Sequence, residues 1–185
     1  FLRDNIPMEL SDQIRRTPAQ KINWPSPPPT LKHHRLKMRL SPFITWMGNR
    51  PKYVFHKDVI SALGEFRDFP FQAEPVILLN KANELLSNDY VIFHHLLELN
   101  AIDSSRSELR DGFASDGSRY VSHIKKLKLQ PEIVSMDYPI LQIEGLRGRL
   151  FFSDKFLARL HQIYKGKKNW ENVNLYSAEK DDLLI

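Results

Sequence analysis

The side chains best suited to chemistry in this sequence are its histidines. His94 and His95 are adjacent in an apolar segment, and Glu98 follows four residues after His94. Residues four apart share one face of a helix, so His94 and Glu98 could offer two ligands to a metal ion. A zinc site needs three or four ligands in a fixed geometry. We therefore interpret these residues, and the isolated His123 and His161, as packed or hydrogen-bonded structural side chains.

The common catalytic signatures are absent from the sequence. It contains no cysteine, which excludes disulfides, thiolate zinc sites and cysteine nucleophiles. It lacks an H-E-x-x-H motif, a G-x-S-x-G elbow and a phosphate-binding G-x-x-x-x-G-K-[ST] loop. The serines between residues 104 and 118, with Asp116-Gly117, are typical of turns and helix ends. We predict a protein that is not an enzyme and that needs no metal, cofactor or small-molecule ligand.

Positive charge is concentrated at the start of the chain. The 185 residues carry a net charge of +5, with a pI of about 9.4. Residues 1–58 hold 11 Lys and Arg against 4 Asp and Glu, whereas residues 59–122 hold 5 against 10 and residues 123–185 hold 11 against 8. A polyanionic partner is therefore expected to meet one end of the molecule.

The first 52 residues predict an extended, Pro-rich basic arm. Eight of the twelve prolines lie here, and the block at residues 25–29 favours polyproline II. Between residues 35 and 40 basic and apolar side chains alternate, which indicates a strand with one basic edge and one apolar edge. We expect an RNA or protein partner to be bound by Lys32, His33, His34, Arg35, Lys37 and Arg39, and a protein partner to pack against Trp24, Leu36, Met38, Leu40 and Trp46.

From residue 53 onward the apolar spacing favours helices. The expected fold class is α+β but mainly α: a small helical domain over residues 53–168 with one C-terminal β-hairpin, preceded by the arm over 1–52 and followed by a polar tail over 169–185. Helices are predicted at residues 7–16, 56–66, 73–86, 90–99, 105–110, 118–128 and 155–164, and a hairpin at 139–153 with its turn at 145–148.

Two further basic clusters lie in this second part of the chain. They consist of Lys125, Lys126 and Lys128 on the predicted helix with Arg147 and Arg149 at the hairpin tip, and of Lys165, Lys167 and Lys168 after the last helix. Helices followed by a hairpin with basic residues at its tip resemble a winged-helix module in layout. A DNA-binding or chromatin-associated module that uses the 118–128 helix and the 145–149 tip is therefore an alternative function.

The leading expectation is a non-catalytic structural subunit of a large multi-protein assembly. Basic, proline-punctuated extensions on small domains suit ribonucleoproteins such as a mitochondrial ribosome, in which the arm would wrap neighbouring protein or RNA. No apolar run approaches the roughly 18–20 residues of a membrane span. The chain begins with Phe1, which suits a removed targeting peptide, so the mitochondrial matrix is the expected compartment and the nucleus the alternative.

Overall fold

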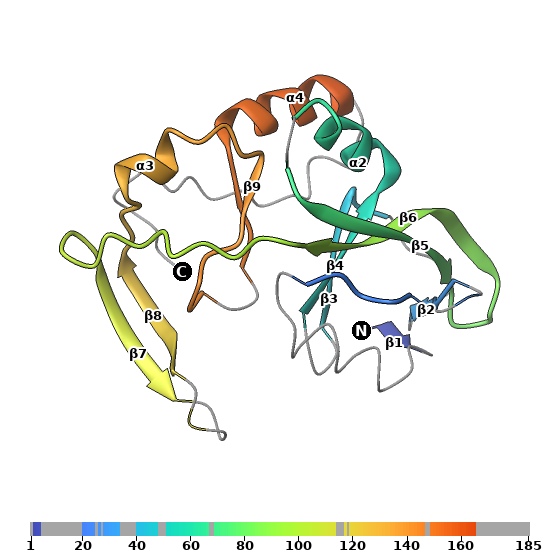
Figure 1. The fold of residues 1–185 in the computed structure, drawn as a ribbon. Coiled ribbons are helices and arrows are strands. Elements are labelled where there is room, and N and C mark those ends of the chain that lie inside the picture. The colour runs from blue at the N-terminus through green and yellow to red at the C-terminus, as the bar shows by residue number, and fades with distance from the viewer. Residues whose placement is uncertain are drawn as a thin grey trace.

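The structure is a computed structural model that describes residues 2–4, 20–24, 26, 28–33, 40–47, 51–66, 69–113, 117, 119–146 and 149–165, with the backbone alone at 2–4, 33, 45–47, 51–52 and 119. The described residues form a mixed β-sheet with two helices on one face, and a separate two-stranded ribbon beside it (Figure 1). The expected mainly helical fold class is therefore wrong, because strands dominate the described part of the chain.

Six strands make up the large sheet, in the order β1-β2-β5-β6-β4-β3. Their bounds are β1 (Leu2–Asp4), β2 (Thr30–His33), β3 (Phe43–Met47), β4 (Pro51–His56), β5 (Phe71–Leu79) and β6 (Leu85–His95). Every neighbouring pair is antiparallel except β2 and β5, which run parallel. Pro75 lacks an N–H, and it precedes the residues of β5 that pair with β2, so no described β2–β5 pairing involves it.

Two helices cover one face of this sheet. Both segments were predicted to be helical from the spacing of their apolar residues. Helix α2 (Lys57–Leu63) begins where the Asp58 N–H donates to Nδ1 of His56, and α4 (Asp154–Tyr164) begins where the Phe156 N–H donates to Oγ of Ser153. The predictions of helices over 56–66 and 155–164 are confirmed. A third, single-turn helix, α3 (Pro131–Val134), begins with proline at its first position.

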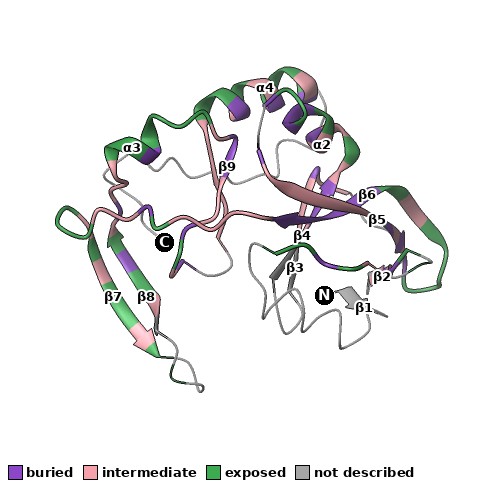
Figure 2. Ribbon diagram, in the orientation of Figure 1, coloured by how far each residue is buried: buried purple, intermediate pink, exposed green. Residues whose placement is uncertain are grey.

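Aromatic rings fill the space between the sheet and these helices. Phe55 stacks on Phe93 with 4.8 Å between ring centroids, and Phe93 stacks on Phe71 at 5.7 Å. Phe66 meets Phe156 of α4 edge to face at 5.7 Å. The fully or nearly buried residues of this layer, which come from both helices and from the sheet, include Val59, Leu63, Phe93, Leu160 and Tyr164. Figure 2 shows this burial along the sheet and on the helix sides that face it.

The opposite face of the sheet is covered by the chain's own N-terminal segment, residues 20–24. Ile22 is 4% exposed and packs with Leu31, Val54 and Ile92, and Trp24 packs against the same cluster. Gln72 fixes the segment: its Nε2 donates to the Ile22 carbonyl at 2.7 Å, and its Oε1 accepts from the Ile22 N–H at 2.9 Å.

The N-terminal third of the chain contributes to the described sheet. Strands β2 and β3 belong to it, and Trp24 and Leu40 pack against its buried cluster, while the packing of a partner against these side chains stays a prediction. The reason is that a sheet with two apolar faces needs a cover on each, and these apolar residues supply the second one. The domain boundaries themselves remain a prediction. The predicted helix over 7–16, residues 35–39 of the predicted strand over 35–40, and the tail over 169–185 lie outside the described residues.

The predicted helices over residues 73–86 and 90–99 are also wrong, since these residues form β5 and β6. The last six residues of β6, from Tyr90 to His95, are all buried, so both faces of the strand are covered. A strand buried on both faces has apolar residues at successive positions instead of alternating apolar and polar ones, so its sequence resembles that of a buried helix. Irregular register between β5 and β6, near Leu78, further disturbs the period of two.

Removing the Gln72 side-chain amide should release the covering segment. We expect Gln72→Ala to lower the free energy of unfolding by about 1–3 kcal/mol, because the buried N–H and carbonyl of Ile22 lose their described partner. Trypsin should then cut faster after the exposed Lys21. Urea unfolding and limited proteolysis measure the two effects. The matched control is Gln162→Ala, at an exposed position of α4, and equal cleavage rates in both variants would contradict the described anchoring.

Candidate nucleic-acid interface

A two-stranded antiparallel ribbon extends away from the rest of the molecule (Figure 1). It consists of β7 (Glu108–Phe113) and β8 (Arg119–Lys126). Its described side chains are mostly exposed or half-buried, in contrast to those of the central sheet (Figure 2). Among its described residues, those at its base pack against a further small core that holds Ala101, Ile124, Leu127, Ile133, Ile143 and Leu146.

The predicted helices over 105–110 and 118–128 are wrong because they correspond to this ribbon. Its register shifts twice, so that Ser122 and Lys125 are each an extra residue of β8 opposite β7. Each extra residue lengthens the spacing between side chains that point toward the core from two residues to three. Val121, Ile124 and Leu127 therefore contact the same core at a spacing that resembles a helix.

A tight turn before β7 fixes the base of the ribbon. The N–H and hydroxyl of Ser105 donate to Oδ1 of Asp103 at 3.1 and 2.6 Å, and the Arg106 guanidinium lies 3.8 Å from Oδ2. These hydrogen bonds and this positive charge hold the pKa of Asp103 below its ordinary value. The Ser107 hydroxyl accepts from the Lys128 N–H and donates to the Lys128 carbonyl, which ties the start of β7 to the end of β8.

Charged side chains of both signs line the exposed part of the ribbon, and the acidic Glu108 and Asp111 lie on the same strand as Arg110. Arg110 and His123 are opposite each other in the register, and both are exposed. The Lys125 ammonium donates to Glu108, which lowers the pKa of Glu108 and raises that of Lys125. Lys126 lies opposite Glu108 in the register, and its positive charge also lowers the pKa of Glu108. Of the described ribbon cations, Arg110 is the one for which no acidic partner is described, so it is available to an anion.

The ribbon ends in an exposed aromatic ring beside a glycine. Phe113 is the last residue of β7 and is 72% exposed, the largest value among the exposed large hydrophobic residues described. The neighbouring Gly112 lies opposite Tyr120, and a Cβ at residue 112 would stand 2.8 Å from Cζ of Tyr120 and 3.0 Å from Cβ of Ser122. The absence of a side chain at Gly112 therefore lets the Tyr120 ring close over the strand.

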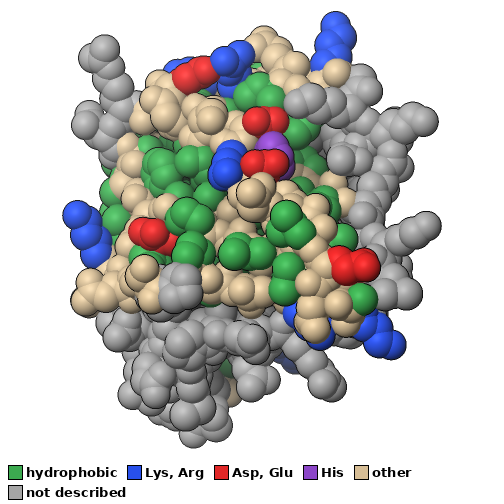
Figure 3. Space-filling model, turned by 90° about the vertical axis from the view of Figure 1, so that its right-hand side faces the viewer, with side chains coloured by type: hydrophobic (Ala, Val, Ile, Leu, Met, Phe, Trp, Pro, Cys, Tyr) green, Lys and Arg blue, Asp and Glu red, His purple; other side chains and the backbone are tan. Residues whose placement is uncertain are grey.

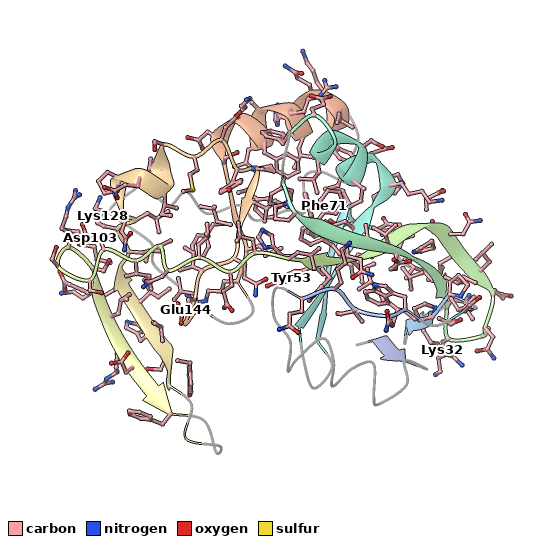
Figure 4. The ribbon with its side chains drawn as sticks, in the orientation of Figure 1. Lys32, Tyr53, Phe71, Asp103, Lys128 and Glu144 are labelled. Atoms are coloured by element: carbon pink, nitrogen blue, oxygen red, sulfur yellow. The ribbon has the colours of Figure 1, made fainter. Side chains whose placement is uncertain are left out.

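The predicted basic residues do not form a single surface in the described structure. Lys125 and Lys126 lie on β8 and Lys128 just after it, whereas Lys32 lies on β2 at the other end of the molecule (Figure 4). His33 and Trp46 are placed by their backbone alone, and Lys165 is exposed after α4. The residues that lie outside the described part are His34, Arg35, Leu36, Lys37, Met38, Arg39, Arg147, Lys167 and Lys168.

The predicted hairpin is present, but it is not a wing. Strands β9 (Ile140–Leu141) and β10 (Phe151–Phe152) pair antiparallel, and Gly145 has the positive φ of 79° that its turn requires. The Gly145 carbonyl accepts from the Val121 N–H at 2.9 Å, and Leu146 is buried, so this turn packs against β8. Residues 119–126 form a strand, so no recognition helix exists there and the winged-helix layout is wrong.

Both buried histidines are hydrogen-bonded to backbone carbonyls, in agreement with their interpretation as structural side chains. His95 is 3% exposed; its Nε2–H donates to the Ile140 carbonyl at 3.2 Å, and its Nδ1 accepts from the Leu97 N–H at 3.0 Å. This pair of partners requires the neutral ring, and burial lowers the pKa of His95 to about 4. His94 donates from Nε2 to the Gln20 carbonyl at 2.9 Å, and burial lowers its pKa as well.

The described residues offer no cluster of three or more His, Asp or Glu side chains that could hold a metal ion. His94 and Glu98 do not share a helix face, because β6 ends at His95. No described helix combines the length and the apolar character that crossing a membrane requires. On the side of the molecule shown in Figure 3, described Lys and Arg side chains are scattered rather than gathered into a patch.

Comparisons with protein-family models and with curated protein sequences find no match for this chain. The functional argument therefore depends on its own residues. Sequence reasoning missed the placement of Arg110, because it predicted a short helix over 105–110. The usable signal was Asp116-Gly117, a dipeptide typical of hairpin turns, between the segments that form β7 and β8.

The two hydrogen bonds of His95 predict a loss of stability in acid. The unfolded state binds a proton below the ordinary histidine pKa of about 6.5, whereas the folded state binds it only near 4. The stabilisation is therefore complete above pH 6.5 and is lost as the pH falls toward 4. We expect this residue to contribute on the order of 2 kcal/mol to the change in unfolding free energy between pH 7 and pH 4.5.

Chemical denaturation at several pH values measures this contribution. His95→Gln removes the titrating group while keeping one amide donor and one amide acceptor, so its unfolding free energy should depend less on pH than that of the unsubstituted protein. His123→Gln, at an exposed position of the ribbon, is the matched control for the same histidine-to-glutamine change. Parallel pH profiles for His95→Gln and the unsubstituted protein would refute the assignment.

Proposed function

We propose that this protein is a non-catalytic, RNA-binding subunit of a ribonucleoprotein assembly, and that it contacts RNA through the β7–β8 ribbon. The observation that carries this proposal is a projecting ribbon with Arg110, for which no acidic partner is described, and with Lys125 and Lys126 beside Glu108. Arg110 and Lys126 lie on this ribbon, with His123 opposite Arg110. Lys and Arg side chains supply most of the affinity of proteins for nucleic-acid phosphates.

The shape of the ribbon supports a groove or loop of RNA as the partner. Its shorter strand, β7, has 6 residues and so extends for about 20 Å. A ribbon of two strands presents side chains along both faces, and RNA helices offer a wide, shallow minor groove together with unpaired loops. The small core at its base, with the Asp103 turn, holds the ribbon in a fixed direction and so reduces the entropy lost on binding.

The charge distribution of the whole sequence supports the same class of partner. Residues 1–58 carry 11 Lys and Arg against 4 Asp and Glu, although much of this segment lies outside the described residues. Its described apolar side chains Ile22, Trp24 and Leu31 are used within the chain, so only its cations are proposed to meet a partner. The mitochondrial ribosome is the proposed example of such an assembly, and the mitochondrial matrix the proposed compartment.

Removing two of the ribbon's cations should weaken RNA binding in a salt-dependent way. We expect Arg110→Gln with Lys126→Gln to reduce the steepness of a plot of log association constant against log salt concentration by about 1–2. Each lost phosphate contact lowers the magnitude of this slope by roughly 0.7–0.9. Filter binding of a structured RNA across a range of salt concentrations measures the slope.

The matched control is Lys21→Gln with Lys81→Gln, which makes the same change in charge at exposed positions outside the ribbon. It should leave the slope near that of the unsubstituted protein. Equal slopes for the two double variants would show that the ribbon is not the RNA-binding surface. Failure of the unsubstituted protein to bind RNA would contradict the proposal as a whole.

A further inference from the structure

We propose that Arg110 and His123 form a phosphate-binding pair on one face of the β7–β8 ribbon, and that protonation of His123 supplies the second positive charge of the pair. This inference rests on the proposed function, because the phosphate belongs to the backbone of the bound RNA. The two residues lie directly opposite each other in the register, and both are exposed. Within the described part of the chain, neither side chain has a hydrogen bond or an ion pair.

An extra residue in β8 places the two side chains on the same face. Residues directly opposite each other in an antiparallel pair share a face, with their Cβ atoms about 4.5–5.5 Å apart. In a regular pairing Ser122 would stand opposite Arg110, and His123 would stand opposite Leu109 on the face that packs against the core. The bulge at Ser122 instead turns His123 toward the side of Arg110. The Ser122 hydroxyl donates to the Arg110 carbonyl at 2.9 Å and so holds this arrangement.

The charged neighbours of the pair favour an anion. Glu108 is the acidic residue that the described ribbon places on this face, and it has two lysines beside it. Lys125 donates to its carboxylate, and Lys126 lies opposite it in the register. Asp111 follows Arg110 along the strand, so it belongs to the other face of the ribbon. The face that carries the pair therefore has an excess of positive charge.

A phosphate suits this pair because both side chains can donate to it. A guanidinium presents parallel N–H groups that match two phosphate oxygens, and an imidazolium donates from both ring nitrogens. A neutral imidazole has a single N–H and no charge, so it contributes less to the site. Tyr120, which shares this face, lies against Gly112 and leaves the pair open to a ligand.

The pair predicts that RNA binding strengthens as the pH falls. A histidine ordinarily gains its proton near pH 6.5, so the second charge is expected at pH 6 and not at pH 8. Filter binding of a structured RNA at both pH values and at several salt concentrations measures the effect. We expect the association constant to rise from pH 8 to pH 6 about 5-fold more in the unsubstituted protein than in His123→Gln. The plot of log association constant against log salt concentration should also become steeper at pH 6, by about 0.5–0.9.

Two substitutions separate the charge of His123 from other effects. His123→Lys supplies a permanent charge at the same position, so it should bind at pH 8 about as tightly as the unsubstituted protein binds at pH 6. Arg110→Gln should weaken binding at both pH values and remove most of the extra pH dependence, because the phosphate is no longer held beside the imidazole. His161→Gln, at an exposed position of α4, is the matched control and should keep the full pH dependence. Urea unfolding at both pH values checks that each variant is folded.

Equal pH dependence in His123→Gln and in the unsubstituted protein would overturn the phosphate-binding pair and leave the proposed RNA binding intact. Strictly additive effects of Arg110→Gln and His123→Gln on the binding free energy would overturn it as well, because two residues that hold one phosphate are coupled. Inorganic phosphate at constant ionic strength should leave RNA binding nearly unchanged, and complete displacement would assign the pair to free phosphate instead. Absence of RNA binding by the unsubstituted protein at both pH values would refute the proposed function itself.

Discussion

The burial of β6 on both faces is the constraint on which the rest of this structure depends. Its last six residues, Tyr90 to His95, are buried in succession, so one face needs a cover of helices and the other a second cover. Helices α2 and α4 provide the first through an aromatic layer around Phe55 and Phe93. Residues 20–24 provide the second, held by Gln72 and by the His94 contact with Gln20.

This constraint also explains which parts of the fold could be predicted from the sequence. Helices α2 and α4 each have one buried and one exposed side, so their apolar spacing identified them correctly. The β9–β10 hairpin was found from its glycine turn. Two strands were mistaken for helices because their apolar residues do not recur at every second position. In β6 the last six residues are buried on both faces, and in β8 Ser122 and Lys125 are extra residues that disturb the alternation.

The candidate site was harder to predict for the same physical reasons. The sequence identified Lys125, Lys126 and Lys128 as a basic group, and the ribbon includes or adjoins all three. It could not place Arg110 on the strand next to them, because that arrangement depends on the pairing of β7 with β8. Trp24 and Leu40 were assigned to a partner, and only the folded sheet reveals that they also pack against the chain's own core.

The resulting picture is a closed body that uses its own N-terminal segment to complete the sheet, and a ribbon that remains available for a partner. Sedimentation of the native protein in a cell extract, with and without ribonuclease, tests the central claim most directly. The account predicts migration with a particle far larger than the 21.7 kDa chain, and a shift to lighter fractions once RNA is digested. Migration as a free monomer under both conditions would contradict it.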